Sequence, residues 1–440
     1  MLLNYLKMAL KALGRNRMYT AITLFGISFT LMVLMIILAL YDTEMGSNTP
    51  ISRGDRIVNA SRLEMFTEMS DTTWTIDSQL VAGQMTYDTL DKEINSGRYM
   101  SAGYMSYRVL TEHLSKVEPK ESYTLFFNRM FTVFKDGQKF SLRGLYTDSE
   151  YWNIYDFTFL AGGPFNYAQV ESAESVAILS QQTAEDYFGG IREAIGQNLP
   201  LSGRSYEIIG VIDRIRTSND DVNAEVYMPV TTTVPDLLTD NSNQGPFQGA
   251  FLAASTSEVE AMKQSMIHIG KQIPIPPEMD FEQISIDAFN REESYADDLF
   301  YEDDVRDSVL YFRLLLFVGL GLFILIPVLN LININLTRMM ERASEISVRK
   351  AYGARRDQIL GQFLFENVIV TFIGGLIGLG LSLFVIQVIN SSGAMPNTVL
   401  SFNGTVFFYS FLLCLALGIL SGLLPAWRIS KQQISEGLRQ

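Results

Sequence analysis

The sequence is poor in the residue types that most often carry catalysis or bind metals. It contains one cysteine, Cys414, and two histidines, His113 and His268, in 440 residues. A single cysteine excludes an intramolecular disulfide, so the stability of any folded domain in this chain must come from its packed core. Neither histidine has a metal-like spacing to Cys414 or to carboxylates, and each is most simply a surface residue.

Nucleotide and calcium motifs are also missing. The pattern GxxxxGK[ST], whose backbone cradles nucleotide phosphates, does not occur in the sequence. Carboxylates are abundant but lack the Asp/Asn/Gly register of a calcium loop, and a solvated acidic surface accounts for them. No pattern indicates a Ser-His-Asp arrangement. We therefore expect no enzyme activity, no metal and no cofactor in this chain.

Charge is absent from three long stretches, residues 18–41, 314–337 and 367–427. A helix needs about 20 apolar residues to cross roughly 30 Å of hydrocarbon, and NSSGAMPN (390–397) supplies a turn that divides the third stretch. Buried helices of a soluble protein are the alternative, but such helices rarely run so long without charge. We expect four transmembrane helices, at residues 18–41, 313–337, 359–389 and 404–427. The first is an uncleaved anchor, because its apolar run exceeds that of a signal peptide.

The distribution of charge predicts the topology. Residues 42–307 contain more than twice as many acidic as basic residues, whereas the rest of the chain is net basic. Lys and Arg favour the cytoplasmic side in short loops. We expect the arm 1–17, the loop 338–358 and the tail 428–440 in the cytoplasm, and the domain 42–312 and the loop 390–403 outside. The chain would then lie in the cytoplasmic (inner) membrane with both termini inside.

The sequence of the outer region, residues 42–312, predicts a mixed α/β domain with two subdomains. The short β-branched runs YEIIGVID (206–213) and SVAIL (175–179) predict strands. TAEDYFGG (183–190) predicts a short helix that Gly189 closes, and IPIPPE (273–278) should break any regular element. Residues 238–249 predict a surface loop.

Residues 295–316 change in character. Apolar and aromatic residues there recur at helical spacing among many acids. We expect an acidic helix that runs directly into the second span as a stalk. A solvated linker helix is the alternative.

Small residues form a stripe in the third span. Gly374, Gly378 and Ser382 recur at every fourth position, with Gly375 beside them. Small residues on one face let helix backbones approach closely. We expect packing within the same subunit, and a contact between subunits is the alternative.

Polar residues occur near the cytoplasmic ends of two spans. Asn330 and Asn333 follow Pro327 in the second span, where Pro327 can kink the helix and the amides should contact protein. Structural packing is the simpler role for them, and substrate contact is the alternative. Glu366 is the one acid within the third span, and pairing with a basic residue of the preceding loop is simpler than proton transport.

A dense mixed-charge segment, ERASEISVRKAYGARRDQIL (341–360), separates spans two and three. Glu345 precedes Arg349 by four residues, the favourable order for a helical ion pair, and Gly353 can end the helix in a left-handed cap. A loop lying on lipid headgroups would be mainly basic. The mixed signs therefore favour a short helix that contacts a cytoplasmic protein.

The same segment resembles the signature of MacB/FtsX-type ABC-transporter permeases, roughly E-R-x-x-E-I-x-[IV]-R-[RK]-A-x-G-A followed by a Glu and a Gly-Gly-x-x-G span. Residues 6–27, 140–165, 183–212 and 422–440 also resemble parts of this family. Ser347, where Gly is usual, and the tail residues Gln433, Ile434 and Gly437 depart mildly from it.

The resemblance implies a dimer of four-span subunits, homomeric or heteromeric, and an outer domain with porter-like and sabre-like parts, the latter at about 141–215. Residues 1–17 would form an amphipathic helix. A separate ABC ATPase would bind ATP and Mg²⁺ and push on a coupling helix formed by Glu341, Arg342, Glu345, Ile346, Arg349, Lys350, Ala351, Gly353 and Ala354. A periplasmic adaptor and an outer-membrane channel are possible further partners besides lipid, and no nucleic acid is expected.

Efflux of a drug, peptide or similar compound, by transmitting ATPase motion to the outer domain, is the leading hypothesis. Lipoprotein release from the membrane is a second transport hypothesis. A transmembrane signal transducer that controls a cell-wall hydrolase or a sensor kinase is a third, although its outer domain is typically smaller. A membrane-anchored enzyme is the least favoured hypothesis.

Overall fold

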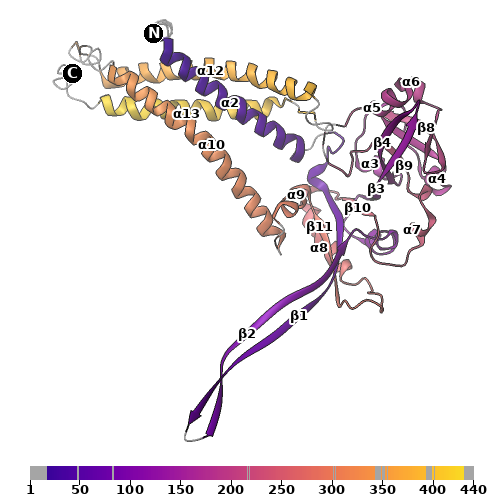
Figure 1. The fold of residues 1–440 in the computed structure, drawn as a ribbon. Coiled ribbons are helices and arrows are strands. Elements are labelled where there is room, and N and C mark those ends of the chain that lie inside the picture. Colours follow the sequence, from indigo (N-terminus) through magenta and orange to yellow (C-terminus); the bar gives the residue numbers. More distant parts are fainter. Residues whose placement is uncertain are drawn as a thin grey trace. The chain divides into compact units, whose positions relative to one another are not determined.

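The computed structural model divides into two compact units (Figure 1). The helical unit comprises Met1–Gly46, Arg216–Ser218 and Ala296–Gln440, and the sheet domain comprises Ser47–Ile215 and Asn219–Tyr295. The structure describes residues 17–46, 49–81, 84–215, 217, 219–300, 302, 304–341, 348, 352–353, 355–392, 399–400 and 402–430.

The described part of the helical unit is built on α2 (Arg17–Met45), α10 (Val305–Glu341), α12 (Arg356–Ser392) and α13 (Gly404–Ser430). Three apolar stretches are long enough to cross a membrane, namely Thr20–Met45, Val305–Leu325 and Leu364–Ser392. The apolar stretch Gly404–Leu420 of α13 is shorter. The structure therefore supports three of the four expected spans by length and composition.

The long helices pack on one another. α12 contacts α2 and α13, and α10 also contacts α2 and α13. The Asn403 side chain just before α13 donates a hydrogen bond to Asp42 of α2, with 3.1 Å between Nδ2 and Oδ2. Asn390 near the end of α12 forms two hydrogen bonds, both of 2.9 Å, with the backbone of Leu400.

The sheet domain contains eleven strands among its described residues, joined in the order β11-β1-β10-β3-β4-β9-β6-β8-β5, with β2 paired to β1 and β7 to β8. The strands are β1 (Ile57–Val81), β2 (Gln84–Gly103), β3 (Ser122–Lys135), β4 (Gln138–Thr147), β5 (Phe159–Gly162), β6 (Val176–Ser180), β7 (Asn198–Leu201), β8 (Arg204–Ile212), β9 (Val226–Pro229), β10 (Gln248–Leu252) and β11 (Gln283–Phe289). Pairing is antiparallel except between β4 and β9 and between β6 and β8. The domain is thus mixed α/β, as the sequence predicts.

Short helices connect and cover the strands. They are η1 (Gly54–Arg56), η2 (Val109–His113), η3 (Leu114–Lys116), α3 (Tyr151–Ile154), α4 (Tyr167–Glu171), α5 (Gln181–Thr183), η4 (Ala184–Phe188), α6 (Ile191–Ala194), η5 (Val230–Thr232), α7 (Pro235–Thr239), η6 (Thr256–Glu258), α8 (Val259–Gly270) and α9 (Arg291–Phe300). The longest of those within the domain, α8, packs on β11.

Aromatic side chains form much of the core. The ring of Tyr151 in α3 lies 4.8 Å from that of Tyr155, the residue after α3, and Tyr151 also contacts Tyr227 of β9. Trp152 packs edge-on against Tyr227 and Phe165. Because aromatic residues bury large areas, this cluster stabilises the junction of α3 with the sheet without any disulfide.

Several local predictions are confirmed. β8 and β6 occupy the two predicted β-branched runs, and residues 273–278 form no helix or strand. The helix predicted in 183–190 continues α5 as η4, and Gly189 closes it with a φ of 89°.

Two expectations differ from the structure. The stalk is not one continuous helix, since α9 ends at Phe300 and α10 begins at Val305, where the Asp304 carboxylate accepts a hydrogen bond from the Arg306 amide. Residues 240–247 do form a loop, but Asn243 and Phe247 within it are fully buried. Asn243 is held there because its side chain accepts from Arg108 and donates to the Pro274 carbonyl.

Candidate functional site

The predicted coupling segment lies mostly outside the described residues. Glu341 is the last residue of α10, and Gly353 has a φ of 89°, the left-handed conformation expected of a helix end. Tyr352 beside it is 90% exposed. The other residues proposed for coupling, Arg342, Glu345, Ile346, Arg349, Lys350, Ala351 and Ala354, fall in the part that the structure does not describe, so their role stays a prediction.

The stripe of small residues in α12 lies against neighbouring helices of this chain. A Cβ atom at Gly374 would come within 2.8 Å of Ile27, and one at Gly378 within 2.9 Å of the Ser28 carbonyl oxygen, both in α2. A Cβ atom at Gly375 would instead clash with the Phe411 ring of α13. Ser382 is fully buried, and its hydroxyl donates to the Leu379 carbonyl. These residues thus occupy close approaches between helices of one subunit.

The other residues predicted to lie within the membrane differ in how far they are buried. Glu366 in α12 is buried, with 5% of its surface exposed. Asn333 in α10 is exposed in this chain, although we expected it to contact protein. Pro327 and Asn330 also lie in α10, but their side chains are outside the described set. Only 11% of the apolar stretch within Val305–Leu325 of α10 is buried, against 39% for the apolar stretches of α2 and α12.

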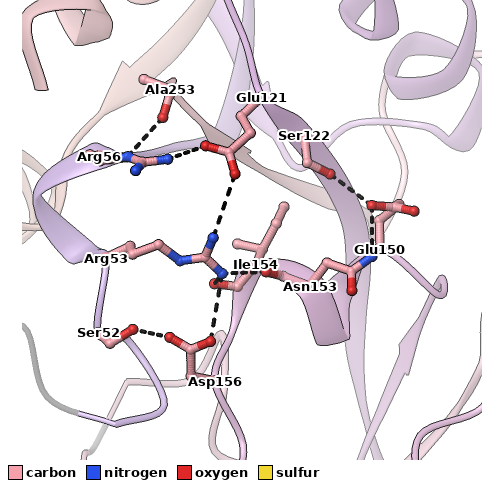
Figure 2. Close-up of polar contacts among 10 residues, drawn as sticks. All are labelled: Ser52, Arg53, Arg56, Glu121, Ser122, Glu150, Asn153, Ile154, Asp156 and Ala253. Atoms are coloured by element: carbon pink, nitrogen blue, oxygen red, sulfur yellow. Dashed lines mark hydrogen bonds and ion pairs between the residues drawn. The ribbon is translucent and has the colours of Figure 1, made fainter. Parts of the chain in front are cut away.

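A network of charged residues holds the chain where it enters the sheet domain (Figure 2). Arg53 lies between Glu121 and Asp156, at nitrogen–oxygen distances of 3.8 and 3.6 Å, and its guanidinium also donates to the backbone carbonyls of Asn153 and Ile154. The same Asp156 accepts from the hydroxyl of Ser52. The entry segment is thereby fixed to the loops around β3 and α3.

A second arginine, Arg56, extends this network. Its Nε donates to the Ala253 carbonyl at 2.9 Å, and its terminal nitrogen pairs with Glu121. Glu121 therefore lies between two arginines that flank the start of β1. Sequence reasoning missed this network, because its members are separated by up to about 200 positions and share no motif.

The chain leaves the domain through the strand next to the one by which it enters. β1 pairs directly with β11, for example through Asn59 and Phe289. After β11, Asn290 and Glu293 exchange hydrogen bonds of 2.8 and 2.9 Å that cap the start of α9. Glu293 also pairs with Lys263 of α8, which is only 6% exposed. Entry and exit are therefore both anchored in the same part of the sheet.

Two half-buried carboxyl groups, Asp148 and Asp221, have raised pKa values. Asp148 accepts hydrogen bonds from the Thr124 hydroxyl and from the amides of Leu125 and Tyr151. Burial nevertheless raises the pKa of Asp148 to about 6. Burial likewise raises the pKa of Asp221 to about 6, and Asn59 donates to it at 2.9 Å. Among the described residues, no group of three or more His, Cys, Asp or Glu is placed to hold a metal ion.

Comparison with known proteins assigns the chain to a family. The model of the MacB-like periplasmic core domain matches residues 20–269, and the model of the FtsX-like permease C-terminal region matches residues 317–434. The macrolide export ATP-binding/permease protein MacB of Acinetobacter baylyi is 26% identical over 281 residues, which cover 63% of this chain and 39% of that protein. The uncharacterized ABC transporter permease YknZ of Bacillus subtilis is 25% identical over 291 residues, covering 66% and 68%.

The chain thus spans about two fifths of the length of the MacB relative. The solved periplasmic region of MacB from Actinobacillus actinomycetemcomitans aligns with 45% of this chain and 84% of that one, at a TM-score of 0.35 and 14% identity. The family assignment rests on the sequence matches and not on this structural likeness. The model of the MacB-like periplasmic core domain alone matches more than half of the chain. The chain belongs to the MacB/FtsX-type permeases of ABC transporters.

Proposed function

We propose that this permease couples ATP hydrolysis by a separate ABC ATPase to movement of its extracytoplasmic sheet domain. The observation that carries the proposal is the hydrogen-bonded pairing of β1, which follows the first span, with β11, which precedes the helices of the second. A displacement of either connection acts on the same two strands. Backbone hydrogen bonds and packed side chains then transmit it to the rest of the sheet.

Several contacts hold both the segment before β1 and the segment after β11, so a displacement of either would pass to the sheet with little loss. Arg53 ties residues 52–56 to two carboxylates and two backbone carbonyls, so the entry segment cannot swing freely before β1 begins. The reciprocal hydrogen bonds of Asn290 and Glu293 do the same for the exit into α9. Hinge motion would instead need a segment with few such contacts.

The energy source in this proposal is a partner. The sequence contains no phosphate-binding loop, whereas the mixed-charge segment 341–355 is predicted from its sequence to form a short helix of alternating sign on the cytoplasmic side. We propose that the ATPase binds ATP and Mg²⁺ and contacts Glu345 and Arg349. Exposed Asn333 and the weakly buried α10 support a second permease subunit, which would cover them.

Efflux of a drug, peptide or similar compound is the proposed outcome. Its support is in the names of two relatives, one a macrolide exporter and the other the pyoverdine export ATP-binding/permease protein PvdT of Pseudomonas fluorescens, 24% identical over 292 residues. A strain with this chain should then resist a panel of drugs and peptides better than a strain without it. Equal sensitivity, with the ATPase intact in both, would count against efflux.

The coupling step is tested on the full chain purified with its ATPase. The double variant Glu345→Ala/Arg349→Ala should lose roughly tenfold in transport-coupled ATP turnover, because a contact worth about 1.4 kcal/mol is a factor of ten. Arg428→Ala, a charge removal in the tail, is the matched control and should keep turnover unchanged. If the double variant copurifies with the ATPase and turns over normally, segment 341–355 is not the coupling element.

A further inference from the structure

The loop between β8 and β9 is tied to the strand by which the chain enters the sheet domain. Its residues 219–225, here called the clasp loop, contain Asp221. The Asp221 carboxyl group accepts a hydrogen bond of 2.9 Å from Nδ2 of Asn59 in β1, and the Asp221 carbonyl accepts one of 2.9 Å from the Tyr151 hydroxyl. Asn59 also pairs with Phe289 of β11. Asp221 therefore contacts the place where the entry and exit strands meet, here called the β1–β11 joint.

The amide oxygen of Asn59 lacks a hydrogen-bond donor. This atom, Oδ1, is buried and has no partner among the described residues, although Nδ2 of the same amide is bonded to Asp221. An ionised carboxylate only accepts hydrogen bonds, whereas a protonated carboxyl group also donates one. A protonated Asp221 can therefore donate to Oδ1 while it accepts from Nδ2. Because an unpaired buried polar atom is costly, this arrangement favours the protonated form.

The surroundings of Asp221 also favour its neutral form. Burial is the largest influence and raises the pKa of Asp221 to about 6. Arg291, at the start of α9, favours the ionised form of Asp221, and the adjacent Asp220 disfavours it. Asp220 is itself paired with Arg143 of β4. Asp221 thus exchanges its proton with water between about pH 5 and pH 7.

The other neighbours of Asp221 do not change their charge in this range. Hydrogen bonds from Asn219 and Asn59 favour its ionised form, but the amide side chains do not titrate. Tyr151 and Tyr155 also interact with Asp221. Burial raises the pKa of both phenols well above the ordinary range, so they stay neutral. A change of pH between 5 and 7 therefore acts on this cluster through Asp221.

We infer that Asp221 and Asn59 form a proton-controlled clasp on the β1–β11 joint. With the proton bound, the carboxyl group and the amide form two hydrogen bonds, and the clasp loop is held on β1. When the proton leaves to water, one bond remains, and the buried negative charge favours exposure, so the clasp loop opens more easily. That an open clasp loosens the joint for displacement rests on the proposed function, whereas the clasp itself does not.

The size of the effect follows from the difference in proton binding. In an open loop the Asp221 carboxyl group is in water, where the pKa of an Asp is about 3.9. The closed loop binds the proton more tightly, because the pKa of Asp221 there is about 6. Closure is therefore strongest in acid and weakens as pH rises through 6. The ratio of open to closed loop should rise roughly tenfold between pH 5 and pH 7, and little more above pH 7.

Hydrogen exchange on the full chain in detergent tests the clasp. The amides of Val222 and Asn223 donate to the Asn219 carbonyl at 3.2 and 3.0 Å, so their exchange requires the clasp loop to open. After correction for the intrinsic effect of pH on exchange, their opening should increase roughly tenfold from pH 5 to pH 7. Asp221→Asn can pair with Asn59 as the protonated acid does. This variant should remain closed at both pH values.

Two further variants make the test specific. Asp148→Asn removes the other carboxyl group whose pKa is raised to about 6, and it should keep the tenfold increase at Val222 and Asn223. Asn59→Ala removes the partner of the proton. It should open the clasp loop at pH 5 about as far as the unmodified chain opens it at pH 7.

Other results would overturn the clasp. Constant opening from pH 5 to pH 7 in the unmodified chain, or a tenfold increase that persists in Asp221→Asn, would show that Asp221 does not control the loop. Protection in Asn59→Ala equal to that of the unmodified chain at pH 5 would show that Asn59 does not share the proton. The exchange is measured without the ATPase, so a failure of ATPase coupling does not alter it, and the two proposals fail separately.

Discussion

At the residue scale, Asp148 is where three elements of the sheet domain meet. It follows β4 and accepts from Thr124 and Leu125 of β3 and from Tyr151 of α3. Three donors favour its charged form, but burial outweighs them and raises its pKa to about 6. Because this value exceeds that of an unfolded Asp, about 3.9, the folded chain binds the proton more tightly, and its stability falls as pH rises between about 4 and 6.

The Asp148→Asn variant should therefore have a flatter pH profile. Raising the pH from 5 to 7 should lower the unfolding free energy of the unmodified chain by about 1 kcal/mol more than that of the variant, because the unmodified chain loses the proton of Asp148 while the proton of Asp221 is lost from both. Urea unfolding of the full chain in detergent at the two pH values, followed by tryptophan fluorescence, measures this. Equal losses would mean that the three donors keep Asp148 ionised throughout this range.

Gly378 offers a second test at this scale. An added Cβ would meet a backbone oxygen, that of Ser28, which cannot rotate away, so α2 and α12 would have to separate. Gly378→Ala should cost about 1–3 kcal/mol by overpacking and lower the melting temperature of the detergent-solubilised chain. Gly380→Ala in the same helix is the control, because nothing lies within 4 Å of its Cβ position. A similar effect of both substitutions would assign the loss to the helix itself rather than to packing.

At the element scale, the entry to β1 depends on Arg53. Its ion pairs are partly exposed, so Arg53→Ala should cost less than about 1 kcal/mol of stability. Loss of its hydrogen bonds to the Asn153 and Ile154 carbonyls should nevertheless free residues 49–56, which hydrogen exchange on the full chain would report as faster exchange there. Arg143→Ala in β4 removes a comparable ion pair, the one with Asp220, and should leave the hydrogen exchange of residues 49–56 unchanged. Unchanged exchange in Arg53→Ala would show that the backbone alone fixes the entry.

Elements with a local signal could be predicted from the sequence. The residues that signal β6 and β8 are short β-branched runs, and the signal that ends η4 is a single glycine, so each signal lies within a few positions of the sequence. The long strands β1 and β2 could not be predicted in this way, because Thr, Ser and Asp make up about half of residues 67–81 and leave no regular alternation of apolar and polar residues. The Arg53 network was missed for a different reason: it depends on residues such as Glu121 and Asp156 that only the folded sheet brings together.

At the scale of the whole molecule, charge and hydropathy were sufficient to predict a membrane protein with a large extracytoplasmic domain, and the family match supports both. The sequence also predicted that Gly374 and Gly378 form a packing face of their helix. It could not predict that α2 packs there, because the spacing of residues within one span does not identify the neighbouring helix. The break between α9 and α10 was missed because an acidic, helix-favouring sequence continues through it.

The orientation of the chain is the remaining prediction at this scale. In a Cys414→Ser background, Glu171→Cys marks the sheet domain and Tyr352→Cys marks the predicted cytoplasmic loop, where the native side chain is 90% exposed. Because basic residues favour the cytoplasmic side, a membrane-impermeant maleimide should label Glu171→Cys in intact spheroplasts and Tyr352→Cys only after permeabilisation. Denatured samples, in which both thiols must react equally, provide the control. Labelling of Tyr352→Cys from outside would invert the topology and place the mixed-charge segment out of reach of any cytoplasmic ATPase.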